Sequence, residues 1–283
     1  MDNQEFFHYS VIVPFRDKYD LFVKAVKSIP DREDIQVIIV DNAPKQLLLD
    51  QVPKKERGRI DLVKSSPSKG AGCARNEGIK HVLGQYLLFL DADDYYTSNA
   101  FDIFDKYLVE KYDIVFFNPT SIYLKDGSAS NRHQLYTNYI NRWLVSHDES
   151  KLRYRWFVPW AKLFRSEFVI KGGFEFAELP VQNDAWFSLV TGHAAKSVFC
   201  DDSIVYVVTE GESGQSLVKI VNRESSFIRY CERIRINKHL KTIGHYDMRI
   251  RLLGSLKIAF KEFGFKEFLR YLNVARKNKV GIF

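Results

Sequence analysis

The run Tyr86-Leu87-Leu88-Phe89-Leu90, followed directly by Asp91-Ala92-Asp93-Asp94, decides the fold of this 283-residue chain. Five consecutive apolar residues are typical of a strand that is buried on both faces, as in a parallel sheet. In open α/β sheets, ligands bind outside the carboxyl ends of the strands, which is where these three carboxylates lie. Clustered carboxylates repel one another unless a cation shares them, and their hard oxygens suit Mg²⁺ or Mn²⁺. The stretch therefore predicts a divalent-metal site that could hold a phosphate; the alternative is a turn of solvated acids.

Strand and helix patterns alternate on both sides of this stretch. Apolar runs predict strands at 9–14, 35–40, 60–63, 114–118 and 203–208, and helical spacing predicts helices at 20–29, 75–83, 101–112 and 185–192. Ser66 to Gly72 is rich in Ser, Gly and Pro and is predicted to be a loop. The β-α-β-β-α-β order predicts an α/β fold with a mostly parallel sheet and right-handed crossovers. Residues 131–155 carry no clear pattern, and 209–216 form a Gly/Ser segment that suits a mobile lid.

Composition and cysteine content indicate the broad class of protein. The chain is 46% apolar and 27% charged, as is usual for a soluble globular protein. Its three cysteines lack paired spacing, which indicates neither a disulfide framework nor a zinc site and favours a reducing compartment. Residues 1–5 lack the basic start and apolar run of a signal peptide, and no stretch approaches the roughly 20 apolar residues of a membrane span. We therefore expect a cytoplasmic protein.

The basic excess is confined to the end of the chain. Residues 223–283 contain fifteen Lys and Arg against five Asp and Glu, while the whole chain has 42 against 35. Apolar and basic residues alternate there with helical spacing, and basic amphipathic helices bind anionic membrane surfaces. We expect residues 223–283 to attach the protein to the inner face of the cytoplasmic membrane as a peripheral protein. The alternative is a helical extension that packs on the rest of the chain and leaves a solvated basic face.

Ser68-Lys69-Gly70-Ala71-Gly72-Cys73-Ala74-Arg75-Asn76 is the glycine-rich segment between the predicted strands. It matches neither G-x-x-x-x-G-K-[ST] nor G-x-G-x-x-G, which disfavours a P-loop enzyme and a nicotinamide-binding fold. Its glycines would still let the backbone approach a ligand, and Arg75 at a helix start could reach a phosphate.

These segments together resemble the inverting glycosyltransferases of family 2, which have a GT-A nucleotide-sugar fold. The likeness covers about residues 9 to 216. The segments that carry it are Ser10-Val11-Ile12-Val13-Pro14, Val37 to Asn42, Gly70 to Gly78, Tyr86 to Asp94, Trp160-Ala161-Lys162-Leu163-Phe164-Arg165 and Asn183-Asp184-Ala185-Trp186-Phe187.

The resemblance implies nucleotide-binding roles for residues that follow the first two strands and the glycine-rich segment. Asp41 would recognise the base, usually uracil, and Arg75 would contact the nucleotide. The remaining residues assigned to the same pocket are Pro14, Phe15, Arg16, Asn42, Gly70 and Ala92. The alternatives are that Asp41 is a turn acid after a strand and that Arg75 is a surface residue of a helix.

The resemblance also implies the acids of the reaction. Asp91 and Asp93 form the family's D-x-D motif, with Asp93 in contact with Mn²⁺ or Mg²⁺ and Asp91 nearer the ribose. Asp184 falls where the family has its catalytic base, although it could instead cap the helix that follows. The sequence departs from the family pattern at Asn183, where Glu is common, so Glu178 is a second candidate base. It also has Ser68 where Asn is usual.

We expect a metal-dependent inverting glycosyltransferase that moves a sugar from a nucleotide sugar, expected to be a UDP-sugar, to a glycan or lipid-linked acceptor of a bacterial capsule, O-antigen or lipopolysaccharide. The expected organisation is a catalytic domain over 1–222, with a nucleotide-sugar half (1–118) and an acceptor half (119–222), and a basic helical extension over 223–283. One alternative is nucleotidyl transfer to a sugar phosphate. The other is a nucleic-acid-binding module, which leaves the acid cluster unexplained, so no nucleic-acid partner is expected.

Overall fold

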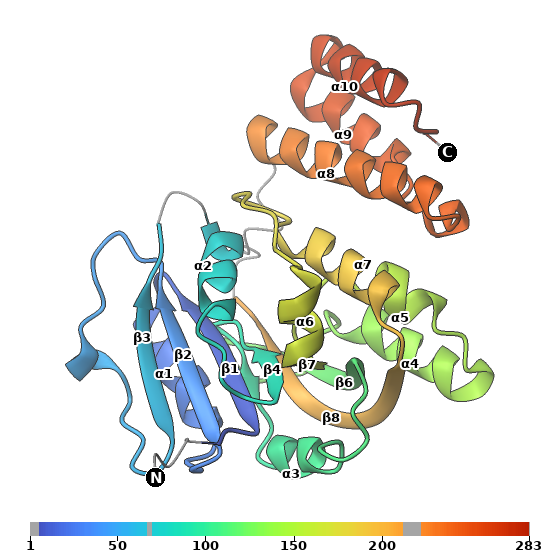
Figure 1. Cartoon of the computed structure of the whole chain (residues 1–283). Helices are drawn as coiled ribbons and strands as arrows, with labels where there is room; N and C mark the ends of the chain where they lie inside the picture. Colours follow the sequence, from blue (N-terminus) through green and yellow to red (C-terminus); the bar gives the residue numbers. More distant parts are fainter. Residues whose placement is uncertain (1–5, 67–69, 212–221, 283) are drawn as a thin grey trace.

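A computed structural model describes residues 6–66, 70–211 and 222–282, and its centre is one curled eight-stranded sheet with helices around it (Figure 1). The strand order is β3-β2-β1-β4-β7-β6-β8-β5. The strands are β1 Tyr9–Phe15, β2 Ile35–Asp41, β3 Arg59–Lys64, β4 Tyr86–Phe89, β5 Tyr95–Tyr96, β6 Ile114–Tyr123, β7 Lys162–Arg165 and β8 Val198–Glu210. The helices are α1 Tyr19–Ser28, α2 Gly70–Ile79, α3 Ala100–Asp105, α4 Gln134–Ser146, α5 Ser150–Arg155, α6 Ser166–Gly172, α7 Asp184–Ala194, α8 Arg223–Thr242, α9 Leu253–Phe263 and α10 Phe265–Lys277.

The first half of the sheet is parallel, as the sequence predicts. β1 pairs in parallel with β2 and β4, and β2 pairs in parallel with β3. Alternate residues of a strand face opposite sides of a sheet. Phe15 packs its ring on Phe22 of α1, with ring centroids 4.6 Å apart, whereas Gly78 of α2 lies against the side chain of Ile12. Helices therefore cover both faces of β1, and the carboxyl ends of β1, β2 and β4 meet at one edge.

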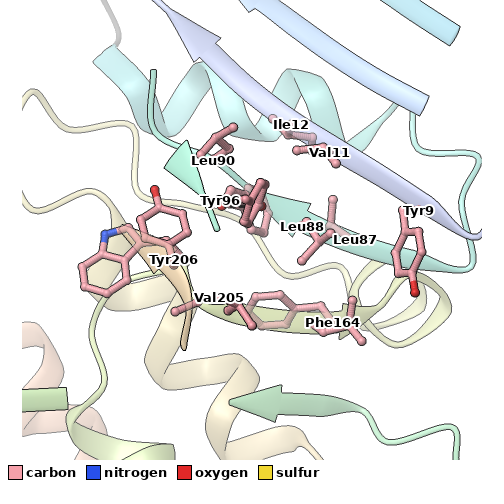
Figure 2. Close-up of a cluster of buried hydrophobic side chains, with 14 of the residues drawn as sticks. Tyr9, Val11, Ile12, Leu87, Leu88, Leu90, Tyr96, Phe164, Val205 and Tyr206 are labelled. Carbon is pink, nitrogen blue, oxygen red and sulfur yellow. Dashed lines mark hydrogen bonds between the residues drawn. The ribbon is translucent and has the colours of Figure 1, made fainter. Parts of the chain in front are cut away.

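The second half of the sheet mixes directions. β7 pairs antiparallel with β4 and β6, and β8 pairs in parallel with β6 and antiparallel with β5. Figure 2 shows the core at the junction of the two halves, where Leu87 and Leu88 lie beside Val11 and Ile12. This junction brings β8 to the end of β4, where the acid cluster begins.

Several predicted boundaries were wrong. Gly70 to Gly72, expected in a loop, form the first turn of α2. The helices predicted at 75–83 and 101–112 end at Ile79 and Asp105. Hydrogen bonds that span three residues follow them, such as His81 N to Gly78 O and Leu108 N to Asp105 O, so these segments are turns.

The strand predicted at 114–118 continues through Pro119 to Tyr123. Proline cannot donate to a ladder, and it is tolerated here because the register with β8 shifts on both sides of Asn118. Residues 131–155, which carried no clear pattern, contain α4 and α5. Of the expected lid, Thr209 and Glu210 belong to β8, while residues 212–216 and also Ser68 lie outside the described residues.

The C-terminal helices form a layer of their own. Figure 1 shows α8 lying between α7 and the α9–α10 pair. Ile236 and Leu240 of α8 pack with Tyr154, Ala185 and Leu189 of α5 and α7 in one buried cluster. The packing of the extension on the rest of the chain, given above as the alternative to membrane attachment, is therefore present. Within the described residues, none of the helices is both long and apolar enough to span a membrane.

Candidate active site

The turn that follows β4 is fixed to β8 by one of its three carboxylates. Asp94 is buried, its Oδ2 accepts from the Tyr206 hydroxyl at 3.0 Å, and its Oδ1 accepts from the Thr209 amide at 2.7 Å. The Tyr206 oxygen also accepts from the Asp91 amide at 3.1 Å. Burial, reinforced by Asp93 and Asp91, raises the pKa of Asp94 well above its ordinary value. Asp94 therefore holds the turn in shape and leaves Asp91 and Asp93 at the sheet edge.

Asp93 is the most accessible acid of the turn. Its side chain is 44% exposed and faces Lys18, whose Nζ lies 3.3 Å from Oδ2. An exposed ion pair of this kind contributes about 0–1 kcal/mol, so a ligand could displace Lys18 from the Asp93 carboxylate. The Thr209 hydroxyl donates to the Asp93 carbonyl oxygen at 2.5 Å and so fixes the main chain. The backbone of Asp93 is held while its carboxylate is available.

A divalent cation fits these residues only together with a substrate. Among the residues that the structure describes, no group of three or more His, Cys, Asp or Glu side chains could hold a metal ion. Mg²⁺ is usually bound through one or two carboxylates, waters and substrate phosphates rather than by an all-protein cage. The available Asp93 carboxylate, beside Asp91, matches that donor set.

Arg75 joins the turn to the start of α7. Its side chain is 6% exposed, its Nη2 is ion-paired with Oδ1 of Asp91, and its Nη1 donates to Asn183 Oδ1 at 3.0 Å. The guanidinium also lies over the Phe176 ring, 5.3 Å from its centroid. Arg75 is therefore not a surface residue. It connects the carboxyl end of β4 with the residue before Asp184, 108 positions along the chain.

Asp184 lies at the point where these contacts converge. It is the first residue of α7, and Asn183 holds the cap position without a side-chain capping bond. Burial raises the pKa of Asp184 to about 6, against the lowering effect of Arg75; Asp91 adds to the rise. A carboxylate with a pKa near 6 is ionised at pH 7 and is also a better proton acceptor than an ordinary aspartate.

Lys162 is a buried cation near the same acid that the sequence did not single out as functional. It is 1% exposed, and its Nζ donates to the Trp156 carbonyl oxygen at 3.1 Å. Burial holds the pKa of Lys162 well below its ordinary value, and the charge of Asp184 opposes that shift. The only signal in the sequence was its place in the Trp160–Arg165 segment, since the burial of a lysine comes from tertiary packing.

The residues expected to bind a nucleotide lie at the ends of β1 and β2. Asp41 is buried, and its two carboxylate oxygens accept from the Ala43 and Leu47 amides at 3.0 and 2.9 Å. Asn42 donates from Nδ2 to the Ser65 hydroxyl at 2.8 Å. These bonds shape the strand ends as in a turn, and each carboxylate oxygen retains a second lone pair for a ligand. At the end of β1, Pro14 is half-buried, Phe15 packs in the core and Arg16 is exposed.

The glycines of α2 allow a main-chain contact beside the site. A Cβ on Gly72 would lie 2.2 Å from the Ala177 carbonyl oxygen, and one on Gly70, whose φ is +75°, would lie 3.0 Å from the Leu179 carbonyl oxygen. Only glycine permits this approach of α2 to the segment that leads into α7. Glu178 lies in this segment but lines a different space, a cavity of about 390 Å³. Its other lining residues include Lys64, Lys80, Asn76 and Glu77.

The structure thus gathers Arg75, Asp91, Asp93 and Asp184 at one edge of a sheet whose strand order and acid turn are those of a GT-A fold. The chain belongs to glycosyl transferase family 2, whose pattern residues 10–169 match. Solved structures agree in fold. S. aureus TarS 1–349 in complex with UDP-GlcNAc has a TM-score of 0.61 and 14% identity, covering 95% of this chain and 72% of that one. A mannosyltransferase from Pyrobaculum calidifontis in complex with GDP-Man and Mn²⁺ has a TM-score of 0.53 and 14% identity, covering 99% and 72%.

Two relatives in sequence each match about one third of the chain. A poly(ribitol-phosphate) beta-glucosyltransferase of Bacillus spizizenii is 33% identical over 98 residues, which is 32% of this chain and 16% of that protein. The UDP-Glc:alpha-D-GlcNAc-diphosphoundecaprenol beta-1,3-glucosyltransferase WfaP of Escherichia coli is 31% identical over 93 residues, or 33% of this chain and 36% of that protein. The chain thus covers between about a sixth and a third of the length of these two relatives.

Proposed function

We propose that this protein is a metal-dependent inverting glycosyltransferase that uses a nucleotide sugar as donor. One observation carries the proposal: Arg75 binds Asp91, at the end of β4, and Asn183, next to Asp184, at the same time. That bridge supports a single site with the proposed diphosphate-binding edge on one side and a carboxylate with a raised pKa on the other. Direct displacement at an anomeric carbon needs those two features facing each other.

Asp184 acts as the general base. An acceptor hydroxyl is a poor nucleophile, and Asp184 accepts its proton as the hydroxyl oxygen bonds to the anomeric carbon. The bond from that carbon to the diphosphate oxygen breaks on the opposite face, so the configuration inverts. Arg75, through its charge and its hold on Asp91, positions the departing diphosphate. Asp184 is favoured over Glu178 because the charges of Arg75, Asp91 and Lys162 act on Asp184, whereas Glu178 lines a cavity with Lys64 and Lys80.

Asp93, assisted by Asp91, would hold Mn²⁺ or Mg²⁺ together with the donor diphosphate. When bound, the cation neutralises the charge that grows on the diphosphate as it leaves. The fit rests on the accessible Asp93 carboxylate and on a main chain fixed through Thr209. Asp94 is excluded from this role because both of its oxygens are engaged with β8.

The donor proposed is a UDP-sugar and the acceptor a glycan or a lipid-linked sugar of a bacterial surface polysaccharide. The Escherichia coli relative is named for a UDP-glucose donor and an undecaprenol-linked acceptor, and the Bacillus spizizenii relative for poly(ribitol-phosphate). Asp41 would read the base, and Arg75 would contact the nucleotide. The pocket would be completed by Pro14, Phe15, Arg16, Asn42, Gly70 and Ala92.

In domain terms, we propose that residues 1–222 form the catalytic domain, with donor and acceptor halves that meet near 118, and that residues 223–283 form an extension. The protein would act in the cytoplasm at the inner face of the membrane, where a lipid-linked acceptor is presented. The net basic charge of the extension supports this placement, because anionic lipids attract Lys and Arg by about 1 kcal/mol per residue near the surface.

A ligand screen followed by product analysis tests the proposed activity. UDP-sugars and GDP-sugars are added with and without Mn²⁺ while the melting temperature is followed, since a ligand that binds only the folded state raises stability by RT ln(1 + [L]/Kd). We expect a UDP-sugar to raise the melting temperature more with Mn²⁺ than without it. Turnover should then release UDP and a product of inverted anomeric configuration. Release of inorganic diphosphate would instead identify a nucleotidyltransferase.

A further inference from the structure

The turn between α9 and α10 presents aromatic side chains to solvent. Gly264, with φ of +86°, links the two helices directly, and Phe260 and Phe265 on either side of it are 56% and 60% exposed. Phe268 lies between them, with ring centroids 5.8 and 6.1 Å from those of Phe260 and Phe265. Scattered apolar side chains are ordinary on a protein surface, but three contacting phenylalanines at one turn are a patch.

The patch continues along α10, and its exposed members lie outside the face used for packing, while Phe268 is half-buried and also packs against the buried cluster of these helices. α9 and α10 bury a different face, formed by Leu256, Ala259, Tyr271 and Ala275, in a cluster with Tyr230 of α8. Figure 1 shows α8 between this helix pair and the rest of the molecule. Leu269, one helical turn after Phe265, is 42% exposed. We call Phe260, Phe265, Phe268 and Leu269 the hairpin patch.

Basic residues surround the hairpin patch in the sequence. Lys257 and Lys261 on α9 and Lys266 on α10 are exposed and lie within three residues of Phe260 or Phe265. The acidic residues nearby are Glu262, which is exposed, and Glu267, which is buried and bound to Arg270 at 3.2 Å. Exposed aromatic side chains beside exposed lysines match the boundary of an anionic bilayer, where phenylalanine enters the acyl region and lysine meets the headgroups.

We propose that the hairpin patch is the element that inserts into an anionic lipid bilayer, while the other basic residues of α8 to α10 act only through long-range attraction. The inference rests on the proposed function, because a bilayer is where a lipid-linked acceptor is found. Its partner is argued from charge complementarity and from Phe260 and Phe265, which are exposed on either side of the turn between the two helices. The patch also lies on the far side of α8 from the proposed catalytic centre, so docking there leaves the sheet edge accessible.

Vesicle partitioning measures the contribution of the hairpin patch. The full chain is mixed with vesicles of phosphatidylcholine alone or with phosphatidylglycerol, and the bound fraction is measured by flotation. We expect binding to the anionic vesicles only, and at least a tenfold weaker partition coefficient for Phe260→Ser/Phe265→Ser. Val109→Ser/Val145→Ser is the matched control, because these two valines are 84% and 87% exposed elsewhere on the molecule. Equal binding of the two double variants would overturn the proposal.

Insertion is distinguished from adsorption by a single-residue probe. Phe265→Trp should be quenched by lipids brominated on their acyl chains, whereas Val109→Trp should show no quenching beyond that of the native protein. Absence of quenching in Phe265→Trp, or loss of a dimer in Phe260→Ser/Phe265→Ser during sedimentation, would overturn the proposal, the latter in favour of a second copy of the chain as occupant. The response to a UDP-sugar in the melting assay reports separately on the transferase site, so failure of one proposal is not read as failure of the other.

Discussion

The acid turn after β4 and the basic helices after residue 222 hold their charges in opposite ways. In the acid turn, burial and fixed partners give each carboxylate a different state: Asp94 is bound to β8, Asp91 is paired with Arg75, and Asp93 is accessible. In α9 and α10 the lysines are exposed, and part of the apolar surface is exposed with them. Packing thus fixes the charges of the acid turn, for which we propose a role in the reaction, and leaves the lysines of α9 and α10 exposed, for which we propose attraction to a surface.

The largest expected effect is that of Asp184→Asn, which keeps the shape of the side chain and removes its ability to accept a proton. We expect kcat to fall by about 10²–10⁴-fold while the melting-temperature response to the nucleotide sugar is retained. Glu178→Gln is the matched control and should keep activity within about threefold. The reverse pattern, with Glu178→Gln inactive and Asp184→Asn active, would assign the role of general base to Glu178.

Asp93→Asn should have the next largest effect. It removes the accessible carboxylate of the turn, so we expect activity to fall by about 10²–10³-fold, equivalent to several kcal/mol of lost charge stabilisation. The Mn²⁺-dependent part of the melting-temperature response should disappear with it. Asp202→Asn, an exposed acid on β8, serves as the control and should behave as the native protein. A native Mn²⁺ response in Asp93→Asn would exclude this residue as the metal ligand.

The rate should also depend on pH because of the raised pKa of Asp184. The base works only when ionised, so kcat/KM should rise about tenfold per pH unit below pH 6 and level off above it. Stability should change in the opposite sense. The folded state holds the Asp184 proton up to about pH 6, above the value for an unfolded aspartate, so this group's contribution to stability is lost as pH rises through 6. Rate profiles that lack the inflection in the native protein would contradict the assignment.

The smallest effect expected is structural and concerns the tie between the acid turn and β8. Tyr206→Phe removes the hydroxyl that donates to Asp94 and accepts from the Asp91 amide. Leaving a buried acid short of a donor costs about 1–3 kcal/mol, which should lower the melting temperature by several degrees. Tyr123→Phe, at an exposed tyrosine, is the control. If Tyr206→Phe melts at the native temperature, the turn does not depend on this bond.

The parallel half of the sheet was predicted correctly because short apolar runs such as Val37 to Val40 are typical of buried strands. Prediction from the sequence failed where tertiary contacts decide. Gly70 to Gly72 were predicted to be a loop, yet they begin α2. The main chain at Ala177 lies so close to Gly72 that only glycine fits there. The strand predicted at 114–118 continues to Tyr123, because a register shift carries it past Pro119.

The acids of the candidate site were named from the sequence, but their connections to other residues were not. The partnership of Arg75 with Asn183 joins residues 108 positions apart, and no local pattern encodes it. Asn183 was noted only as a departure from the family pattern, although its amide oxygen is the group that Arg75 reaches. The differing states of Asp91, Asp93 and Asp94 likewise follow from burial and from β8, which is distant in sequence.

The contact of Gly70 and Gly72 with the chain at Ala177 and Leu179 has a practical meaning for anyone who would redesign this protein. At Gly72 the two main chains meet directly, since an added Cβ would lie 2.2 Å from the Ala177 carbonyl oxygen, so their spacing cannot be tuned by choosing a smaller residue. Attempts to alter acceptor preference should graft new loops elsewhere and leave both strips of chain untouched. Even one added methyl group would push the two backbone segments apart and disturb the alignment of donor and acceptor in the proposed reaction.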